Sequence, residues 1–148
     1  MTKETLEEFR ERVRKEYGPM YFDRQGKEIA LMEWGRKCED HDYKIVKQEE
    51  VDKYFISTVW IGLNMQMFRN APKQIFETMI FLQDEENKNP DDPLHLYQAR
   101  YSTEEEAIKG HEEALALCRA QIVVEKRIKF LEAENEKDSQ QEDLVPLP

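Results

Sequence analysis

Apolar residues recur at helical spacing in the first segment of the chain. They lie three or four residues apart with charged residues between them, at Leu6, Phe9, Val13 and Tyr17. This spacing places them on one face of a helix. Gly18 and Pro19 follow and are typical of a helix end. The pattern predicts an N-terminal amphipathic helix over residues 1–18.

Further along the chain the apolar period changes from that of a helix to that of a strand. Residues 20–22 resemble a short strand, and a helix is expected from about Leu31, where Trp34 and Cys38 share its face. From Tyr43 the period is two, which indicates β-structure. We expect strands over residues 43–46, 53–63, 75–82 and 96–101, separated by polar connections.

The strand over residues 53–63 (KYFISTVWIGL) is the strongest of these because it is rich in β-branched and aromatic residues. Both of its faces are apolar, with Phe55, Val59 and Ile61 on one and Tyr54, Ile56 and Trp60 on the other. A strand of this kind is usually central in a sheet that is covered on both sides. We therefore expect other parts of the chain to pack on both faces of the sheet at this strand.

The last helix begins with a clear local signal. Ser102 or Thr103, followed by Glu105 or Glu106, forms a capping box. The helix is expected to run from residue 103 to about 134. Its apolar face shifts midway, from Ile108, Leu115, Cys118 and Ile122 to Val124, Ile128 and Leu131. Residues after Leu131 lack periodicity and predict a disordered tail.

Together the elements predict an α+β fold, with a small antiparallel sheet of about four strands, flanking helices and a long C-terminal helix. The division along the chain is expected to be an N-terminal amphipathic helix (1–18), an α+β core domain (19–120), a helix extension (121–134) and a disordered acidic tail (135–148). At 148 residues the chain fits one modest core with appendages.

Composition narrows the class of protein. No window approaches the roughly 18 consecutive apolar residues of a membrane span, and the charged N-terminus lacks the core of a secretory signal. Cys38 and Cys118 are the only cysteines and are expected to be reduced thiols. We expect a cytoplasmic protein that does not bind a membrane.

The net charge of −10 is unevenly distributed. From Glu132 onward six acidic residues stand against Lys137 alone, which gives −5, half of the total. The chain has no basic stripe, so direct binding to nucleic acid is disfavoured.

Five segments of the chain carry a family resemblance. In order they read YFDRQGKEI, MEWGRKCED with DYKIV after it, STVWIGLN, IFETMIF and RYSTEEEAIKGHEEAL. They resemble a family of short bacteriophage and prophage proteins for which no activity is known. The resemblance covers about residues 21–117. It implies that the gene lies in a phage or prophage genome, but it implies no chemical activity. Family members often carry a histidine and a Gly-rich connection where this chain has Met65 and residues 69–73.

The histidines offer little sign of a metal or catalytic site. His41 lies among Cys38, Glu39, Asp40 and Asp42, but the spacing matches no metal signature and is typical of a solvated helix end. His111 is followed by two glutamates without the second histidine of a metalloprotease helix, so a surface position is expected. We expect no catalytic residue, no metal and no cofactor.

One group of residues is the candidate binding site. Glu77 shares a strand face with Met79 and Phe81, and Arg100 on a neighbouring strand is its expected partner in a cross-strand ion pair. Trp60 and Asn64 face a connection that is unusually apolar, which either folds onto the core or presents an adaptable contact surface. The candidate residues are Trp60, Asn64, Met65, Met67, Phe68, Glu77 and Arg100.

The function expected from these observations is that of a non-enzymatic phage accessory protein that binds a host or phage protein. A sharper form of this hypothesis is an acidic mimic of nucleic acid that acts against a host defence system. Two alternatives stay open: a small ligand-binding or hydrolase domain with a pocket near Trp60, and a minor virion-associated protein.

The apolar stripe Val124, Ile128 and Leu131 predicts an assembly contact, because it lies beyond the core domain. Three helical turns are marginal in water without a partner. A homodimer or a heteromeric contact through this stripe is expected. The alternative is that the helix bends and packs its stripe on the N-terminal helix at Leu6 and Phe9.

Overall fold

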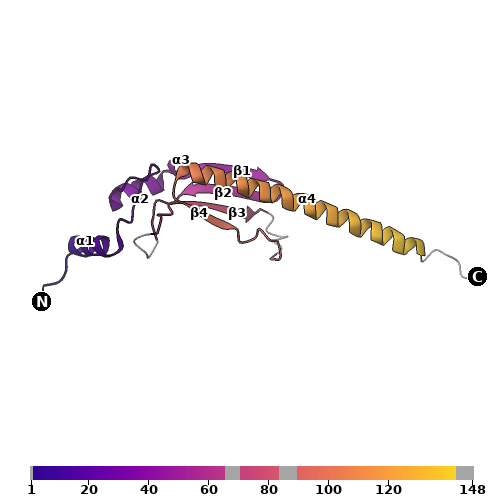
Figure 1. Cartoon of the computed structure of the whole chain (residues 1–148), viewed down its shortest axis with the longest axis horizontal. Helices are drawn as coiled ribbons and strands as arrows, with labels where there is room; N and C mark the ends of the chain where they lie inside the picture. Colours follow the sequence, from indigo (N-terminus) through magenta and orange to yellow (C-terminus); the bar gives the residue numbers. More distant parts are fainter. Residues whose placement is uncertain (1, 66–70, 84–89, 143–148) are drawn as a thin grey trace, which may run out of the picture.

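A four-stranded antiparallel sheet lies at the centre of the fold (Figure 1). The computed structural model describes residues 2–65, 71–83 and 90–142. Within these residues the sheet has the order β1-β2-β3-β4, and the long helix α4 (Glu104–Glu142) crosses one face of it. The strands are β1 (Ile45–Val51), β2 (Tyr54–Trp60), β3 (Phe76–Leu82) and β4 (Gln98–Tyr101). The predicted α+β fold with a small antiparallel sheet and a long C-terminal helix is confirmed.

The antiparallel register sorts the strand side chains onto two faces. On the face beneath α4, Tyr54, Ile56 and Trp60 of β2 are buried. Residues directly opposite one another share a face, so the other face is defined by the pairs Phe55–Phe81, Ser57–Met79, Val59–Glu77, Glu77–Arg100, Met79–Gln98, Gln48–Ser57 and Glu50–Phe55. We call it the open face.

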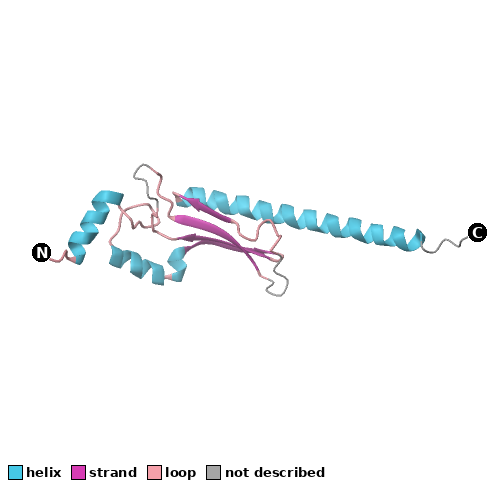
Figure 2. Cartoon of the chain, turned by 90° about the horizontal axis from the view of Figure 1, so that it is seen from below, coloured by secondary structure: helices cyan, strands magenta, loops and turns pink. Residues whose placement is uncertain are grey.

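Cover on the open face is partial. Helices α2 (Leu31–Glu39) and α3 (His41–Lys44) lie across the sheet from α4 at one end only (Figure 2). Phe55 and Val59 are half-buried, whereas every second residue of β2 on the α4 side is buried. The expectation that this strand is covered on both sides therefore holds only near its C-terminal end.

Helix α4 lies close to the sheet because its contact face carries small residues. Ala107 and Ala114 are fully buried, and a Cβ atom added to Gly110 would lie 2.1 Å from the Tyr101 ring. Leu115 and Cys118 continue the buried face toward the C-terminus. The core therefore consists of large side chains from the sheet that meet a helix with little side-chain bulk.

The structure corrects two predicted strands. Residues 43 and 44, expected to begin a strand, belong to α3 (His41–Lys44), in which the Asp40 carboxylate accepts the Tyr43 N–H at 3.1 Å. The strand begins at Ile45 instead and continues through a polar stretch to Val51. The short strand expected at 20–22 is reduced to two isolated bridges, Tyr21 with Leu63 and Phe22 with Glu28.

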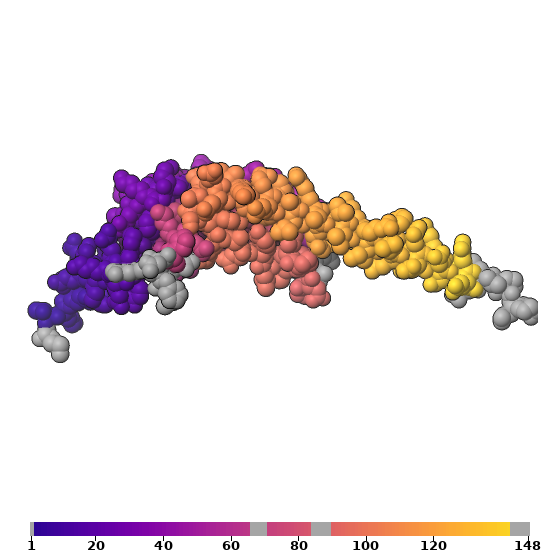
Figure 3. Space-filling model, in the orientation of Figure 1, coloured from indigo at the N-terminus to yellow at the C-terminus, as the bar shows by residue number. Residues whose placement is uncertain are grey.

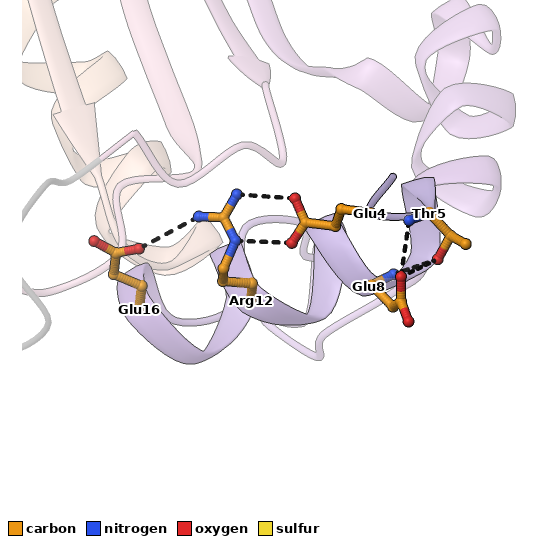
Figure 4. A network of polar contacts seen from close by, with 5 residues as sticks. All are labelled: Glu4, Thr5, Glu8, Arg12 and Glu16. Carbon is orange, nitrogen blue, oxygen red and sulfur yellow. Dashed lines mark hydrogen bonds and ion pairs between the residues drawn. The ribbon is translucent and has the colours of Figure 1, made fainter. Parts of the chain in front are cut away.

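Helix α1 (Leu6–Tyr17) forms one end of the molecule (Figure 1). It begins with a capping box in which Thr5 and Glu8 exchange hydrogen bonds, and Arg12 bridges Glu4 and Glu16 on its outer side (Figure 4). None of its residues is buried. An ion pair between Arg14 and Glu28, at 2.7 Å, joins it to the body.

Helix α4 is longer than predicted. Its start agrees with the sequence, since Thr103 Oγ1 accepts the Glu106 N–H at 3.1 Å. It continues to Glu142, so residues 135–142, expected in a disordered tail, are helical. Residues 143–148 lie outside the described residues. No helix in the described part of the chain has both the length and the hydropathy needed to cross a membrane.

The C-terminal half of α4 projects beyond the sheet, away from α1 (Figures 1 and 3). The alternative in which its stripe packs on Leu6 and Phe9 is therefore wrong. Both of these residues are exposed, as are Val124, Ile128 and Leu131.

Candidate functional site

A groove of about 550 Å³ lies between the open face of the sheet and the helices α2 and α3. Helix α2 contributes Trp34 and Cys38, and α3 contributes Lys44. The sheet contributes Val59, Glu77 and Arg100, among others. The groove is mainly apolar on its floor and carries charged groups at its edges.

The structure brings four of the candidate binding residues to this groove, which is lined by Trp60, Met65, Glu77 and Arg100. Asn64 lies instead at a neighbouring hollow, together with Lys73, and its N–H donates to the Met20 carbonyl at 2.8 Å. The predictions for Met67 and Phe68 concern residues outside those the structure describes.

Two tryptophans form a rigid wall of the groove. Trp60 is almost fully buried, and its Nε1–H donates to the Phe22 carbonyl at 3.0 Å. The Nε1–H of Trp34 donates to the Ile61 carbonyl, also at 3.0 Å. Tyr43 packs edge-on against Trp60, with ring centroids 5.0 Å apart. Because each indole is fixed by a backbone acceptor and by packing, this wall keeps its shape without a ligand.

Glu77 and Arg100 form the opposite, polar wall. Arg100 Nε donates to Glu77 Oε2 at 3.0 Å, and Gln98 Nε2 donates to the same oxygen at 2.6 Å. The predicted cross-strand ion pair is confirmed. Since the two charges balance, this wall offers hydrogen bonds without a net charge.

The remaining polar side chains of the groove include Cys38, Gln48, His41 and Lys44. Burial raises the pKa of the Cys38 thiol, so the thiol stays protonated and is a poor nucleophile at neutral pH. His41 is exposed, as expected for a solvated helix end, and Lys44 is half-buried. Within residues 2–65, 71–83 and 90–142 no three metal-binding side chains converge.

Beside the groove the open face carries an apolar cluster that the sequence analysis did not single out. We define it as Phe55, Met79 and Phe81. The two phenylalanine rings are 6.2 Å apart, and Phe81 is 44% exposed. The alternation of apolar residues within each strand was visible in the sequence. Only the register between β2 and β3 shows that Phe55 and Phe81 lie opposite one another.

His111 was placed wrongly by the sequence analysis. It is fully buried between α4 and the sheet, where Nδ1 is 2.8 Å from Thr58 Oγ1, and Thr58 in turn is 2.6 Å from Thr78 Oγ1. Because all three side chains are buried, His111, Thr58 and Thr78 belong to the core and not to the groove. The spacing Ala107, His111, Ala114 and Cys118 was the signal for its burial.

Comparisons with known proteins found no matching family, no matching curated protein and no matching solved structure. The resemblance to the phage family therefore stays a prediction. Inferences about function rest on the geometry of this chain.

Proposed function

We propose that the protein is a non-enzymatic accessory protein of a bacteriophage that binds another protein through the open face of its sheet. The observation that carries the proposal is the apolar cluster of Phe55, Met79 and Phe81 beside the groove, in which Phe81 is 44% exposed and the other two side chains are partly buried. Contiguous exposed apolar side chains on a folded domain typically mark an interaction surface.

The groove and the cluster complement one another as a binding surface. The groove beside Trp34 can receive one apolar side chain of a partner. The cluster then offers flatter apolar contact, and Glu77 with Arg100 supplies a polar edge between them. This arrangement of an anchor pocket, an apolar area and a polar edge is typical of protein interfaces.

The charge of the chain indicates the kind of partner. With a net charge of −10, the protein attracts basic surfaces and repels acidic ones at long range. We therefore expect the partner to present apolar side chains within a net-basic segment. Binding of this kind weakens as salt is added.

The experiment compares partner binding by the parent chain and two single variants. Phe81→Ser removes the exposed ring of the cluster, and Ile108→Ser is the matched control, since Ile108 is also 44% exposed but lies on α4. A protein captured from infected cells is purified and its affinity measured by calorimetry at two salt concentrations. We expect weaker binding for Phe81→Ser, unchanged binding for Ile108→Ser, and weaker binding at high salt.

The proposal fails if no captured protein binds in purified form. It also fails if Phe81→Ser binds as tightly as the parent chain, or if Ile108→Ser weakens binding to the same extent.

A second candidate function is favoured by the size of the groove. Its volume of about 550 Å³ falls within the range of small-molecule sites. A panel of nucleotides and metabolites in a thermal-shift assay tests it, because a ligand that binds the folded state raises the midpoint of unfolding. Stabilisation that is lost in Arg100→Ala favours this candidate, and no stabilisation across the panel rejects it.

A further inference from the structure

Helix α4 carries a second apolar row outside the set of residues that it buries against the sheet. The row consists of Leu117, Val124, Ile128 and Leu131, each between 43% and 49% exposed. With Gln121 and Asn135 it forms positions 117, 121, 124, 128, 131 and 135, which alternate in steps of four and three. Such alternation is the heptad pattern of a coiled coil, with 121, 128 and 135 at a and the others at d.

We propose that this row joins two copies of the chain in a parallel, two-stranded coiled coil. The C-terminal part of this row lies on the half of α4 that projects past the sheet (Figures 1 and 3), where Val124, Ile128 and Leu131 are exposed in the described part of the chain. The proposal concerns a different surface from the open face and does not depend on the proposed function.

The residues at the core positions select two parallel strands. Ile128 at a and Leu131 at d are the combination that favours parallel dimers. Asn135 at a meets its own equivalent only when the helices are parallel, where the two amides hydrogen-bond to each other. In the antiparallel arrangement centred between Ile128 and Leu131, Asn135 instead faces the apolar Val124 of the second copy.

The flanking charges select the same orientation. Arg127 at g and Glu132 at e are five residues apart, the spacing at which g and e side chains of parallel helices meet. The dimer therefore gains this attraction twice. In the antiparallel arrangement Arg127 approaches Glu134, but Glu125 and Glu132 approach each other and repel, so the attraction is offset. This complementarity indicates a second copy of the chain as the occupant of the row.

The end of α4 also needs support from outside its own turns. The last turn has no basic residue, and Glu136, Asp138 and Glu142 lie near the negative end of the helix dipole. Acidic residues at this end destabilise an isolated helix. Pairing with a second helix buries Val124, Ile128 and Leu131 and so stabilises the turns that precede this end.

Mass in solution tests the assembly. Light scattering of the full chain should give about twice the monomer mass of 17.8 kDa. The double variant Ile128→Lys with Leu131→Lys should give the monomer mass with unchanged helical circular dichroism of the core. The control Val123→Lys with Phe130→Lys adds the same charge to two exposed apolar positions outside the row and should stay dimeric.

Cross-linking tests the orientation. In the parallel dimer, Asn135→Cys places two thiols side by side, so mild oxidation should give a disulfide-linked dimer. In the antiparallel arrangement the two thiols are roughly 16 Å apart along the helix axis, so oxidation gives no disulfide-linked dimer. A monomeric parent chain, or a dimer that survives the Ile128 and Leu131 changes, overturns the assembly. A dimer whose Asn135→Cys variant does not cross-link overturns the parallel orientation.

Discussion

The imidazole of His111 lies in the interior of the domain, where a charge is costly. Burial lowers the pKa of His111 below its ordinary value of 6.5, and this effect outweighs the opposing influence of Glu49 and Glu112. Glu49 Oε1 is 3.4 Å from His111 Nε2, and Lys47 contacts both glutamates. The folded state therefore holds a neutral histidine beside a network of surface charges.

This lowered pKa predicts a loss of stability in acid. The unfolded chain binds a proton at His111 below about pH 6.5, whereas the folded chain binds it only at lower pH. The stability due to neutral His111 is therefore complete above that pH. It falls as the pH drops toward the folded pKa, by up to about 1.4 kcal/mol per pH unit.

Urea unfolding of the parent chain and of His111→Asn measures this effect, at about pH 7 and about pH 5. The parent chain should lose more of its free energy of unfolding than the variant between the two conditions. All carboxylates are common to both proteins, so the difference isolates the imidazole. Equal losses in the two proteins would contradict the prediction.

Asp92 is a buried carboxylate whose partners fix the loop before β4. Its side chain is 1% exposed and accepts the Tyr54 hydroxyl at 2.7 Å and the Leu94 N–H at 2.9 Å, while Lys53 lies 3.2 Å away. Burial acts to raise the pKa of Asp92, but these partners together lower it. The carboxylate is therefore ionised, and each of its two oxygens accepts a hydrogen bond.

Removal of this carboxylate should be costly. Asp92→Ala leaves the Tyr54 hydroxyl and the Leu94 amide without their acceptor, with an expected loss of about 3–5 kcal/mol in the free energy of unfolding. Tyr54→Phe, which removes only the hydroxyl, should cost about 1 kcal/mol. Urea unfolding compares them, and a cost for Asp92→Ala no larger than that of Tyr54→Phe would refute the argument.

At the scale of elements, the close approach of α4 to the sheet depends on Gly110. A methyl group at this position would lie 2.1 Å from Cζ and from the hydroxyl of Tyr101, which is too close for either group to remain in place. The helix would have to move away from β4, and the neighbouring Ala107 and His111 would lose contact.

Two glycine substitutions test this close packing. In a helix interior, Gly→Ala normally stabilises by about 0.5–1 kcal/mol. Gly110→Ala should instead destabilise by about 1–3 kcal/mol because of overpacking. Gly35→Ala is the control, since it is helical in α2 and has no atom within 4 Å of the added methyl, and it should stabilise. Thermal unfolding measures the stability of both variants. A stabilising Gly110→Ala would show that a methyl group fits between α4 and Tyr101.

At the scale of the whole molecule, the chain has a central body with one helix projecting at each end (Figure 1). A hollow of about 660 Å³ separates α1 from residues 20–31, with Phe9 and Ile29 at its wall. The ion pair between Arg14 and Glu28 is half-exposed, and such pairs contribute little to stability. The body should therefore fold without α1.

Deletion of residues 1–17 tests this independence. The free energy of unfolding of the truncated chain should lie within about 1 kcal/mol of that of the full chain, because only a surface ion pair is lost. Ile29→Ala, at a buried position of the body, should cost about 2–5 kcal/mol and shows that the assay detects core damage. A loss of similar size on deletion of α1 would place this helix in the core.

The sequence by itself determined the elements whose patterns are local. The apolar face of α1, the Thr103 cap of α4 and the alternation of β2 and β3 follow from periodicity and hydrogen bonding within a few residues. The ion pair between Glu77 and Arg100 was also predictable, because neighbouring strands bring facing charges together. These features depend on residues that are close in sequence or that face each other on neighbouring strands.

The tertiary structure decided the features that depend on partners distant in sequence. The polar strand β1 exists because β2 pairs with it, not because residues 47–50 favour a strand. His111 is buried because α4 docks on Thr58, and Phe55 joins Phe81 because the β2–β3 register places them together. A shift in the β2–β3 register would separate Phe55 from Phe81, so no pattern within one strand fixes this contact.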